Sequence, residues 1–307
     1  MNLPLGFTAT ATDPLPLHEV SRATLADWHA LQPPAIGAWL DAQAFDGSPG
    51  TALVWAAADG QLAGAVLGVG DGLDPYAYGH APFALPARTW RLTGEFDTAT
   101  RAALRLGWGL GAYRYSRYKQ PLRLPAQLLV EDVLRHVQSL PRTGSGDDRL
   151  AEVFDLLAAS VRVRDLINTP TEHMGPDQLE QLACEIAERH GAQIEVISGE
   201  DLLTRNFPAI HAVGRASHRA PRLIALRWGD EAHPHVAIVG KGVCFDTGGL
   251  DLKAADGMRN MKKDMGGAAH AIALAELIMA RQLHLRITLL CRRSRMRLAR
   301  TRIAPAK

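Results

Sequence analysis

Short apolar runs alternate with helical segments through the second half of this 307-residue chain, and this alternation restricts the fold more than any other feature. Amphipathic or alanine-rich segments predict helices at 149–167, 175–191 and 266–282. The apolar runs are short and bounded by turn residues, which is typical of strands, and they lie at 194–197, 223–227, 236–239 and 283–290. Strands separated by helices indicate a wound α/β sheet.

The first half of the chain predicts a smaller α/β domain of its own. Two apolar runs, 51–57 and 62–69, flank Asp59-Gly60 and predict a hairpin. A helix is expected at 98–110, with Asp97 as its N-cap. The polar, turn-rich residues 141–148 predict a linker. We therefore expect a first domain at 1–140 and a second domain at 149–290.

Charge is distributed unevenly along the chain. The formal net charge is +2, but residues 291–307 contain six Arg, one Lys and no acidic residue. Residues 1–290 then hold 27 Lys and Arg against 32 Asp and Glu, a net charge of −5. A mildly acidic body is thus followed by a short, strongly basic tail. Three widely spaced cysteines form no CxxC pair, which favours a reducing compartment.

The segment richest in chemical groups follows the strand predicted at 236–239. It reads Gly-Lys-Gly-Val-Cys-Phe-Asp-Thr-Gly-Gly-Leu-Asp-Leu-Lys at 240–253 and continues with Met-Lys-Lys-Asp-Met-Gly-Gly-Ala-Ala at 261–269. Gly242 after Lys241 excludes a P-loop, and Phe245 excludes a dinucleotide-binding turn. The spacing alone leaves two interpretations open, namely structural turns with solvated charges, which it favours, and a metal or phosphate site.

These two segments resemble the metal-binding core of the leucine aminopeptidase, or cytosol aminopeptidase, family. Asn-Thr-Pro-Thr at 168–171 and Met-Gly-Pro at 174–176 are similar to the start of that family's catalytic domain. Residues 107–118 are similar to the end of its N-terminal domain. Ala254 and Asp256 replace the commoner Pro and Ser. The resemblance covers about 1–290, and it implies a two-domain metallopeptidase fold.

The resemblance also implies roles for four residues. Lys241 and Asp264 would bind one ion, Asp246 would bridge two ions, and Lys253 would act as an electrophile on the scissile carbonyl. The implied cofactors are two divalent ions, Mn²⁺ or Zn²⁺, which polarise the carbonyl and lower the pKa of bound water. The implied substrates are peptides with a free N-terminus, and the implied assembly is a homo-oligomer, a hexamer in the family.

The resemblance stops near residue 290. The Pro-Ala-Val-Glu-Asn and Asn-Thr-Asp-Ala-Glu-Gly-Arg segments that the family has further along are missing, so the second domain is expected to be incomplete, with at most one well-formed metal site. A back-translation of residues 291–307, with one G restored and the frame shifted, reads Val-Pro-Ala-Val-Glu-Asn and onward. We therefore hypothesise that a frameshift produced the basic tail as an aberrant sequence.

These observations lead to one expected function and two alternatives. We expect an aminopeptidase-like, cytoplasmic protein whose activity is impaired because part of the metal site is missing. The first alternative is a non-catalytic subunit or interaction protein derived from the same family. The second is nucleic-acid binding through the arginine-rich tail, which we rank last. No run of ~18 apolar residues occurs, so we expect no membrane association.

Overall fold

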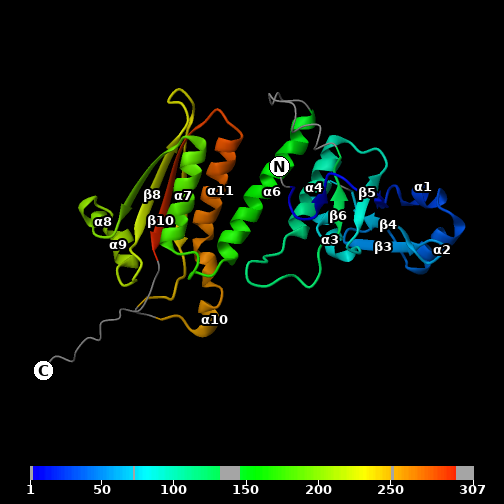
Figure 1. The fold of residues 1–307 in the computed structure, drawn as a ribbon, viewed down its shortest axis with the longest axis horizontal. Coiled ribbons are helices and arrows are strands. Elements are labelled where there is room, and N and C mark those ends of the chain that lie inside the picture. Colours follow the sequence, from blue (N-terminus) through cyan, green and yellow to red (C-terminus); the bar gives the residue numbers. More distant parts are fainter. Residues whose placement is uncertain (1–2, 72, 132–145, 250–251, 295–307) are drawn as a thin grey trace. The chain divides into compact units, whose positions relative to one another are not determined.

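The computed structural model describes residues 3–71, 73–131, 146–249 and 252–294 (Figure 1). The chain divides into two compact units, unit 1 at Met1–Ala158 and unit 2 at Ala159–Lys307. Both units combine helices with a sheet, so the α/β, two-part architecture expected from the sequence is confirmed. Within the described ranges, every helix is too short or too polar to traverse a bilayer.

Unit 1 is built on a six-stranded sheet in the order β1-β6-β5-β2-β4-β3. Neighbouring strands are parallel from β1 through to β4, and β3 alone is antiparallel to its neighbour. The elements of this unit are β1 Phe7–Thr8, β2 Leu15–Val20, α1 Leu25–Ala30, α2 Pro34–Ala42, β3 Thr51–Ala56, β4 Leu62–Gly68, η1 Pro75–Tyr78, α3 Ala81–Ala84, β5 Thr89–Thr93, α4 Thr98–Ala112 and β6 Gln127–Leu129.

Two predictions for this unit are confirmed. Strands β3 and β4 form the antiparallel hairpin expected around Asp59-Gly60. Helix α4 begins at Thr98, and Asp97 caps it because its Oδ1 accepts a hydrogen bond from the Thr100 amide at 2.7 Å. Because this cap satisfies a backbone N–H that the first turn leaves without a partner, it defines where the helix starts.

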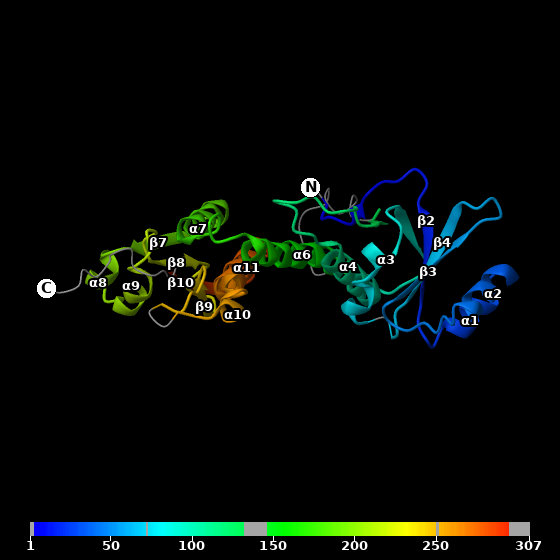
Figure 2. The same cartoon turned by 90° about the horizontal axis from the view of Figure 1, so that it is seen from below.

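The sheet of unit 1 is covered on both faces. Leu104 and Trp108 of α4 pack with Leu17 in one apolar cluster, whereas Leu40 of α2 packs with Val66 in another. Figure 2 shows α1 and α2 on the side of the strands away from α4. The parallel strands therefore lie between two helical layers, which accounts for their largely apolar sequences.

Unit 2 holds a four-stranded sheet in the order β7-β8-β10-β9. Strand β9 is parallel to β10, whereas β7 and β10 are both antiparallel to β8. The elements are the end of α6 Gly146–Asn168, which begins in unit 1, and α7 Pro176–His190, β7 Gln193–Ser198, α8 Asp201–Thr204, α9 Pro208–Gly214, β8 Arg222–Trp228, β9 His235–Val243, α10 Ala255–Met258, η2 Met261–Met265, α11 Gly266–Ala280 and β10 Arg286–Ser294.

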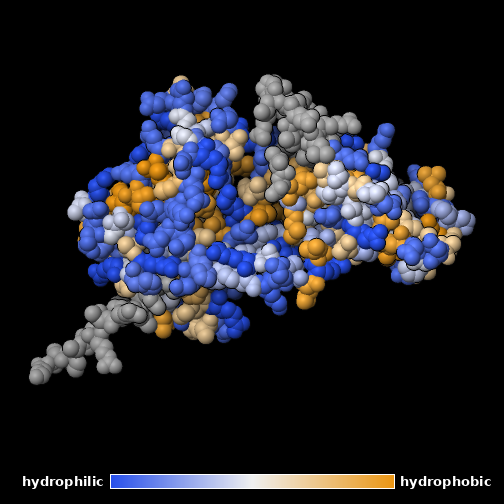
Figure 3. Space-filling model, in the orientation of Figure 1, coloured by the Kyte–Doolittle hydropathy of each residue, from blue (hydrophilic) through white to orange (hydrophobic). Residues whose placement is uncertain are grey.

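Helices α7 and α11 cover one face of this sheet, and α8 and α9 cover the other. Ile186 of α7 and Ile272 of α11 pack against Leu226 of β8, while Leu202 of α8 packs with Leu223 on the opposite face. Helix α7 ends at Gly191, whose φ of 66° is the left-handed conformation that glycine favours at a helix C-terminus. The side of unit 2 drawn in Figure 3 is largely hydrophilic, as expected where α7 turns its polar face outward.

Two boundaries differ from the sequence-based expectation. The linker was predicted at 141–148, but residues 146–148 belong to α6, and residues 141–145 lie outside the described residues. The last strand was predicted at 283–290 with an aberrant tail from 291, but β10 spans Arg286–Ser294. Cys291 is fully buried and pairs with Ile224 of β8 and Gly240 of β9, so backbone pairing and burial extend the strand beyond residue 290. Residues 295–307 lie outside the described residues.

Candidate metal centre

Lys241 lies near the end of β9, where this edge strand approaches the start of α11 closely. A Cβ atom on Gly240 would be 2.6 Å from the Cα of Ala268 and 2.8 Å from the carbonyl oxygen of Gly267. Only glycine permits this contact, which explains the glycine before the lysine. The close approach places Lys241 beside η2, the short helix that precedes α11 and contains Asp264.

The four residues singled out from the sequence form two ion pairs. Lys241 Nζ lies 2.8 Å from Asp264 Oδ1, and Lys253 Nζ lies 2.7 Å from Asp246 Oδ2. Both carboxylates are largely buried, with exposed fractions of 14% for Asp264 and 17% for Asp246, whereas Lys241 is 59% exposed. The structure therefore pairs each lysine with one aspartate across the segment from 241 to 264.

The Asp246 carboxylate is held by its own loop as well as by lysine. Its Oδ1 accepts a hydrogen bond from the Gly248 amide at 2.8 Å, and the Lys253 amide donates to the Thr247 carbonyl at 3.0 Å. The hydrogen bond from the Lys253 ammonium lowers the pKa of Asp246, and the charge of Lys241 lowers it further. Since Lys241 acts on Asp246 while it pairs with Asp264, the two ion pairs belong to one electrostatic cluster.

Two contacts at this cluster were not expected from the sequence. Lys262 Nζ donates a hydrogen bond to Asn168 Oδ1 at 2.9 Å, which joins η2 to the end of α6. Lys253 Nζ also lies 3.3 Å from the sulfur of Met261. Lys262 stands in the same run as Asp264, but its partner is 94 residues away, so no local spacing could reveal the contact.

The oxygen atoms of this cluster fit a hard divalent cation in part. The second carboxylate oxygen of Asp264, Oδ2, is buried and has no hydrogen-bond partner among the described residues, so it is a potential metal ligand that these residues leave unsatisfied. Carboxylate oxygens suit Mn²⁺ and similar ions. Among the described residues, however, no group of three or more His, Cys, Asp or Glu side chains is gathered as a metal cluster. The described residues thus fit part of a metal site.

Comparison with known proteins covers both units. Residues 161–295 match the model of the cytosol aminopeptidase family, catalytic domain, and residues 15–131 match that of the M17 aminopeptidase N-terminal domain. A probable cytosol aminopeptidase from Corynebacterium efficiens is 38% identical over 184 residues, which are 60% of this chain and 35% of that protein.

Two solved structures share the fold along nearly the whole chain. The cytosol aminopeptidase from Coxiella burnetii is 36% identical with a TM-score of 0.81, and the match covers 97% of this chain and 62% of that one. The bottromycin maturation enzyme BotP, solved in complex with Mn, is 27% identical with a TM-score of 0.74 over the same fractions of the two chains. The chain thus spans about a third of the length of the curated relative and under two thirds of these structures. Because the models of both domains match along the chain, it belongs to the cytosol aminopeptidase family.

Proposed function

We propose that this chain carries the N-terminal domain and part of the catalytic domain of a metalloaminopeptidase, which removes N-terminal residues from peptides. The observation that supports this most directly is the pair of adjacent Lys–Asp contacts at the family's matching segment. In this proposal Lys241, Asp246 and Asp264 would hold divalent cations, with Asp246 shared between two of them. We propose Mn²⁺ as the bound cation, because the structure of BotP was solved in complex with Mn.

The chemistry would divide between the cations and the protein. Bound cations would polarise the scissile carbonyl and supply hydroxide near neutral pH. Lys253 would donate a hydrogen bond to the carbonyl oxygen from an ammonium group that Asp246 holds in place at 2.7 Å. The unsatisfied Oδ2 of Asp264 would contribute a carboxylate donor next to Lys241. Lys241 must lose its proton to act as a ligand, and nearby cations favour that loss.

We further propose that the 307-residue polypeptide by itself has little or no aminopeptidase activity. Two-metal catalysis needs both ions to be held, and the described residues gather no cluster of three acidic, His or Cys ligands. We expect purified protein with added Mn²⁺ to release no p-nitroaniline from leucine p-nitroanilide above the buffer control. Robust Mn²⁺-dependent release would show that these residues suffice and would contradict the proposal.

A direct binding measurement tests the metal ligands independently of activity. We expect the protein to bind Mn²⁺ with one dominant site, measured as the loss of the free-ion signal in electron paramagnetic resonance. Asp264→Asn should weaken this binding at least tenfold, because it removes the charge and one carboxylate oxygen. Asp256→Asn is the matched control, since that carboxylate lies in the same segment and is 95% exposed. Equal effects of the two substitutions would refute the assignment of Asp264.

The proposal also includes the location of the protein in the cell and its oligomeric state. We place the protein in the cytoplasm and expect it to associate with copies of itself, as the family resemblance implies. Size-exclusion chromatography with light scattering measures the second expectation. A strictly monomeric chain at ~100 µM would contradict it.

A further inference from the structure

The end of α6 contacts the short helix η2, although α6 supplies none of the four charged residues of the candidate metal centre. Lys262 Nζ donates a hydrogen bond of 2.9 Å to Asn168 Oδ1. Asn168 is the last residue of α6, and Lys262 stands in η2 two residues before Asp264. This hydrogen bond therefore links a helix end to the segment that carries one of the proposed metal ligands.

The backbone of α6 is well supported where Asn168 leaves it. The backbone N–H of Thr169 and its hydroxyl both donate to the carbonyl oxygen of Asp165, at 2.9 and 2.6 Å. Thr169 is only 5% exposed. Because these two bonds close the last turn of the helix, they fix the backbone on which the side chain of Asn168 is carried. The hydrogen-bond acceptor of Lys262 is thus held at a helix end and not on a free loop.

An apolar cluster joins the same segments of unit 2. Leu166 of α6, Met265 of η2 and Cys244 belong to it, and each of the three is at most 5% exposed. Cys244 stands two residues before Asp246, and Met265 directly follows Asp264. The two segments that carry the carboxylates of the candidate centre therefore pack in one core with the end of α6.

Lys262 enters this arrangement as a cation beside a neutral partner. It is half-buried, and among the described residues it makes no ion pair. Since like charges repel, a further ammonium group near the ligands opposes the binding of a cation. The charge of Lys262 thus works against the proposed metal centre, and only its hydrogen bond to Asn168 works in favour of it.

We propose that Lys262 is a positioning residue, which anchors η2 to Asn168 and so keeps the Asp264 carboxylate beside Lys241. This inference rests on the proposed metal centre. Helix η2 spans only five residues, so few backbone hydrogen bonds of its own hold it in place. An anchor from outside the helix therefore decides how firmly Asp264 is held.

Mn²⁺ binding by the full chain tests this role, with the free-ion signal in electron paramagnetic resonance as the measurement. Lys262→Met should weaken the binding about tenfold, at the lower end of the usual cost of losing an outer partner in a metal site. Lys262→Arg keeps a charged donor and should bind Mn²⁺ as the parent does. Unchanged or tighter binding by Lys262→Met would overturn the proposal, because the loss of a positive charge alone favours a cation.

The parent protein separates this inference from the proposed function. If the parent binds Mn²⁺ and Lys262→Met binds it equally well, the positioning role fails and the metal centre stands. If the parent binds no Mn²⁺, the metal centre and the positioning role are refuted together.

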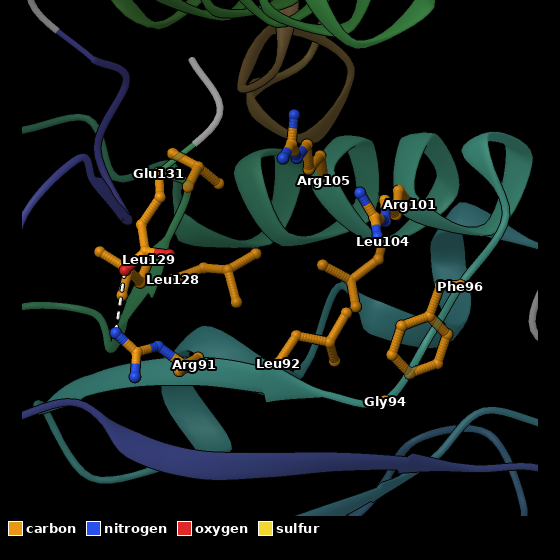
Figure 4. A pocket seen from close by; sticks show the side chains of 11 residues that line it. Arg91, Leu92, Gly94, Phe96, Arg101, Leu104, Arg105, Leu128, Leu129 and Glu131 are labelled. Atoms are coloured by element: carbon orange, nitrogen blue, oxygen red, sulfur yellow. Dashed lines mark hydrogen bonds and ion pairs between the residues drawn. The ribbon is translucent and has the colours of Figure 1, made fainter. Parts of the chain in front are cut away.

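Two control variants make the same change of charge at other places. Lys263→Met alters the neighbouring lysine, which is exposed. Arg91→Met removes an exposed ion pair of 2.9 Å with Glu131 in unit 1, drawn as a dashed line beside a cavity of about 340 Å³ in Figure 4. Both variants should bind Mn²⁺ at least as tightly as the parent. Weakening by either control as large as that by Lys262→Met would refute a specific role of Lys262.

Hydrogen exchange in the metal-free protein distinguishes positioning from unfolding. In Lys262→Met we expect the amides of η2 to exchange about tenfold faster than in the parent, the usual effect of losing a hydrogen bond to a charged group. The amides of β8, which is mostly buried, should keep their parental rates. Parental exchange of η2 would show that Lys262 does not hold this helix, and equal acceleration in β8 would show a loss of overall stability. Either result would refute the proposal.

Discussion

Glu19 at the end of β2 carries a carboxyl group that the fold keeps from ionising easily. Burial raises its pKa from the ordinary 4.5 to about 7, the hydrogen bond from the Tyr78 hydroxyl at 2.9 Å opposes this shift, and the charge of Asp97 adds to it. The second oxygen of Glu19, Oε2, is buried and has no hydrogen-bond partner within the part of the chain that the structure describes. Ionised Glu19 is therefore a destabilising feature of unit 1.

The size and sign of the effect follow from this pKa. Because the folded-state value of about 7 lies above 4.5, the stabilising contribution is fully present below pH 4.5 and is lost as the pH rises through 7. Each unit of pKa corresponds to ~1.4 kcal/mol, so the complete loss is ~3 kcal/mol. Between pH 5 and pH 8.5 the expected loss is ~2–3 kcal/mol, since part of the transition lies below pH 5.

Glu19→Gln removes the titration and keeps an oxygen that can accept the bond from Tyr78. We expect the free energy of unfolding of the variant, measured relative to the parent, to rise by ~2–3 kcal/mol between pH 5 and pH 8.5. Urea titrations followed by tryptophan fluorescence in a Trp228→Phe background measure it, because the other five tryptophans all lie in unit 1. Glu95→Gln, at an exposed carboxylate, should change stability by under ~0.5 kcal/mol at either pH. Parallel pH profiles of Glu19→Gln and its parent would refute the reasoning.

Two further substitutions test packing and ion-pair contacts within unit 2. Gly240→Ala places a methyl group 2.6 Å from a backbone atom of α11, so we expect the free energy of unfolding in urea to fall by ~1–3 kcal/mol. Gly257→Ala is the control, because a methyl group there would meet its nearest described atom at 4.0 Å, and it should lower the free energy of unfolding by under ~1 kcal/mol. Equal stability of the two variants would contradict the close approach. Arg222→Ala removes the partner of two carboxylates on α7 and should lower the free energy of unfolding in urea by ~3 kcal/mol. Arg227→Ala is the control, because Arg227 is exposed, and it should lower the free energy of unfolding by under ~1 kcal/mol. A cost below ~1 kcal/mol for Arg222→Ala would show that its ion pairs are not needed.

Elements with local signals were predictable from the sequence. Asp97 indicates the start of α4, Gly191 indicates the end of α7, and Asp59-Gly60 indicates the hairpin of β3 and β4. Each signal acts within a few residues, because caps and tight turns depend on short-range hydrogen bonds and on backbone conformation. These boundaries therefore follow from chemistry that a single segment contains.

Other features depend on partners far away in the chain. The order β7-β8-β10-β9 arises from pairing between segments up to 71 residues apart, the separation of Arg222 and Arg293 (293 − 222). It places β10 between β8, which pairs with it as far as Arg293, and β9, which pairs with it as far as Ser294. The apolar run from 283 does not show this, because Leu283 lies before the strand begins and the basic residues after Cys291 do not resemble a strand sequence. In the candidate site, the family resemblance rather than spacing singled out the four charged residues, and it did not indicate the direct ion pair between Lys241 and Asp264.

The pairing has a consequence for the electrostatics of the proposed metal centre. Two carboxylates and two ammonium groups balance one another's charges, so the burial of Asp246 and Asp264 costs less than the burial of unpaired carboxylates would. A divalent cation that enters this cluster adds positive charge beside Lys241, and coordination by that lysine requires the release of its proton. Cation binding and proton release are thus coupled, and the affinity for the cation should increase with pH. In the proposed centre, the same lysine would therefore stabilise the fold as an ammonium ion and serve as a ligand once it is deprotonated.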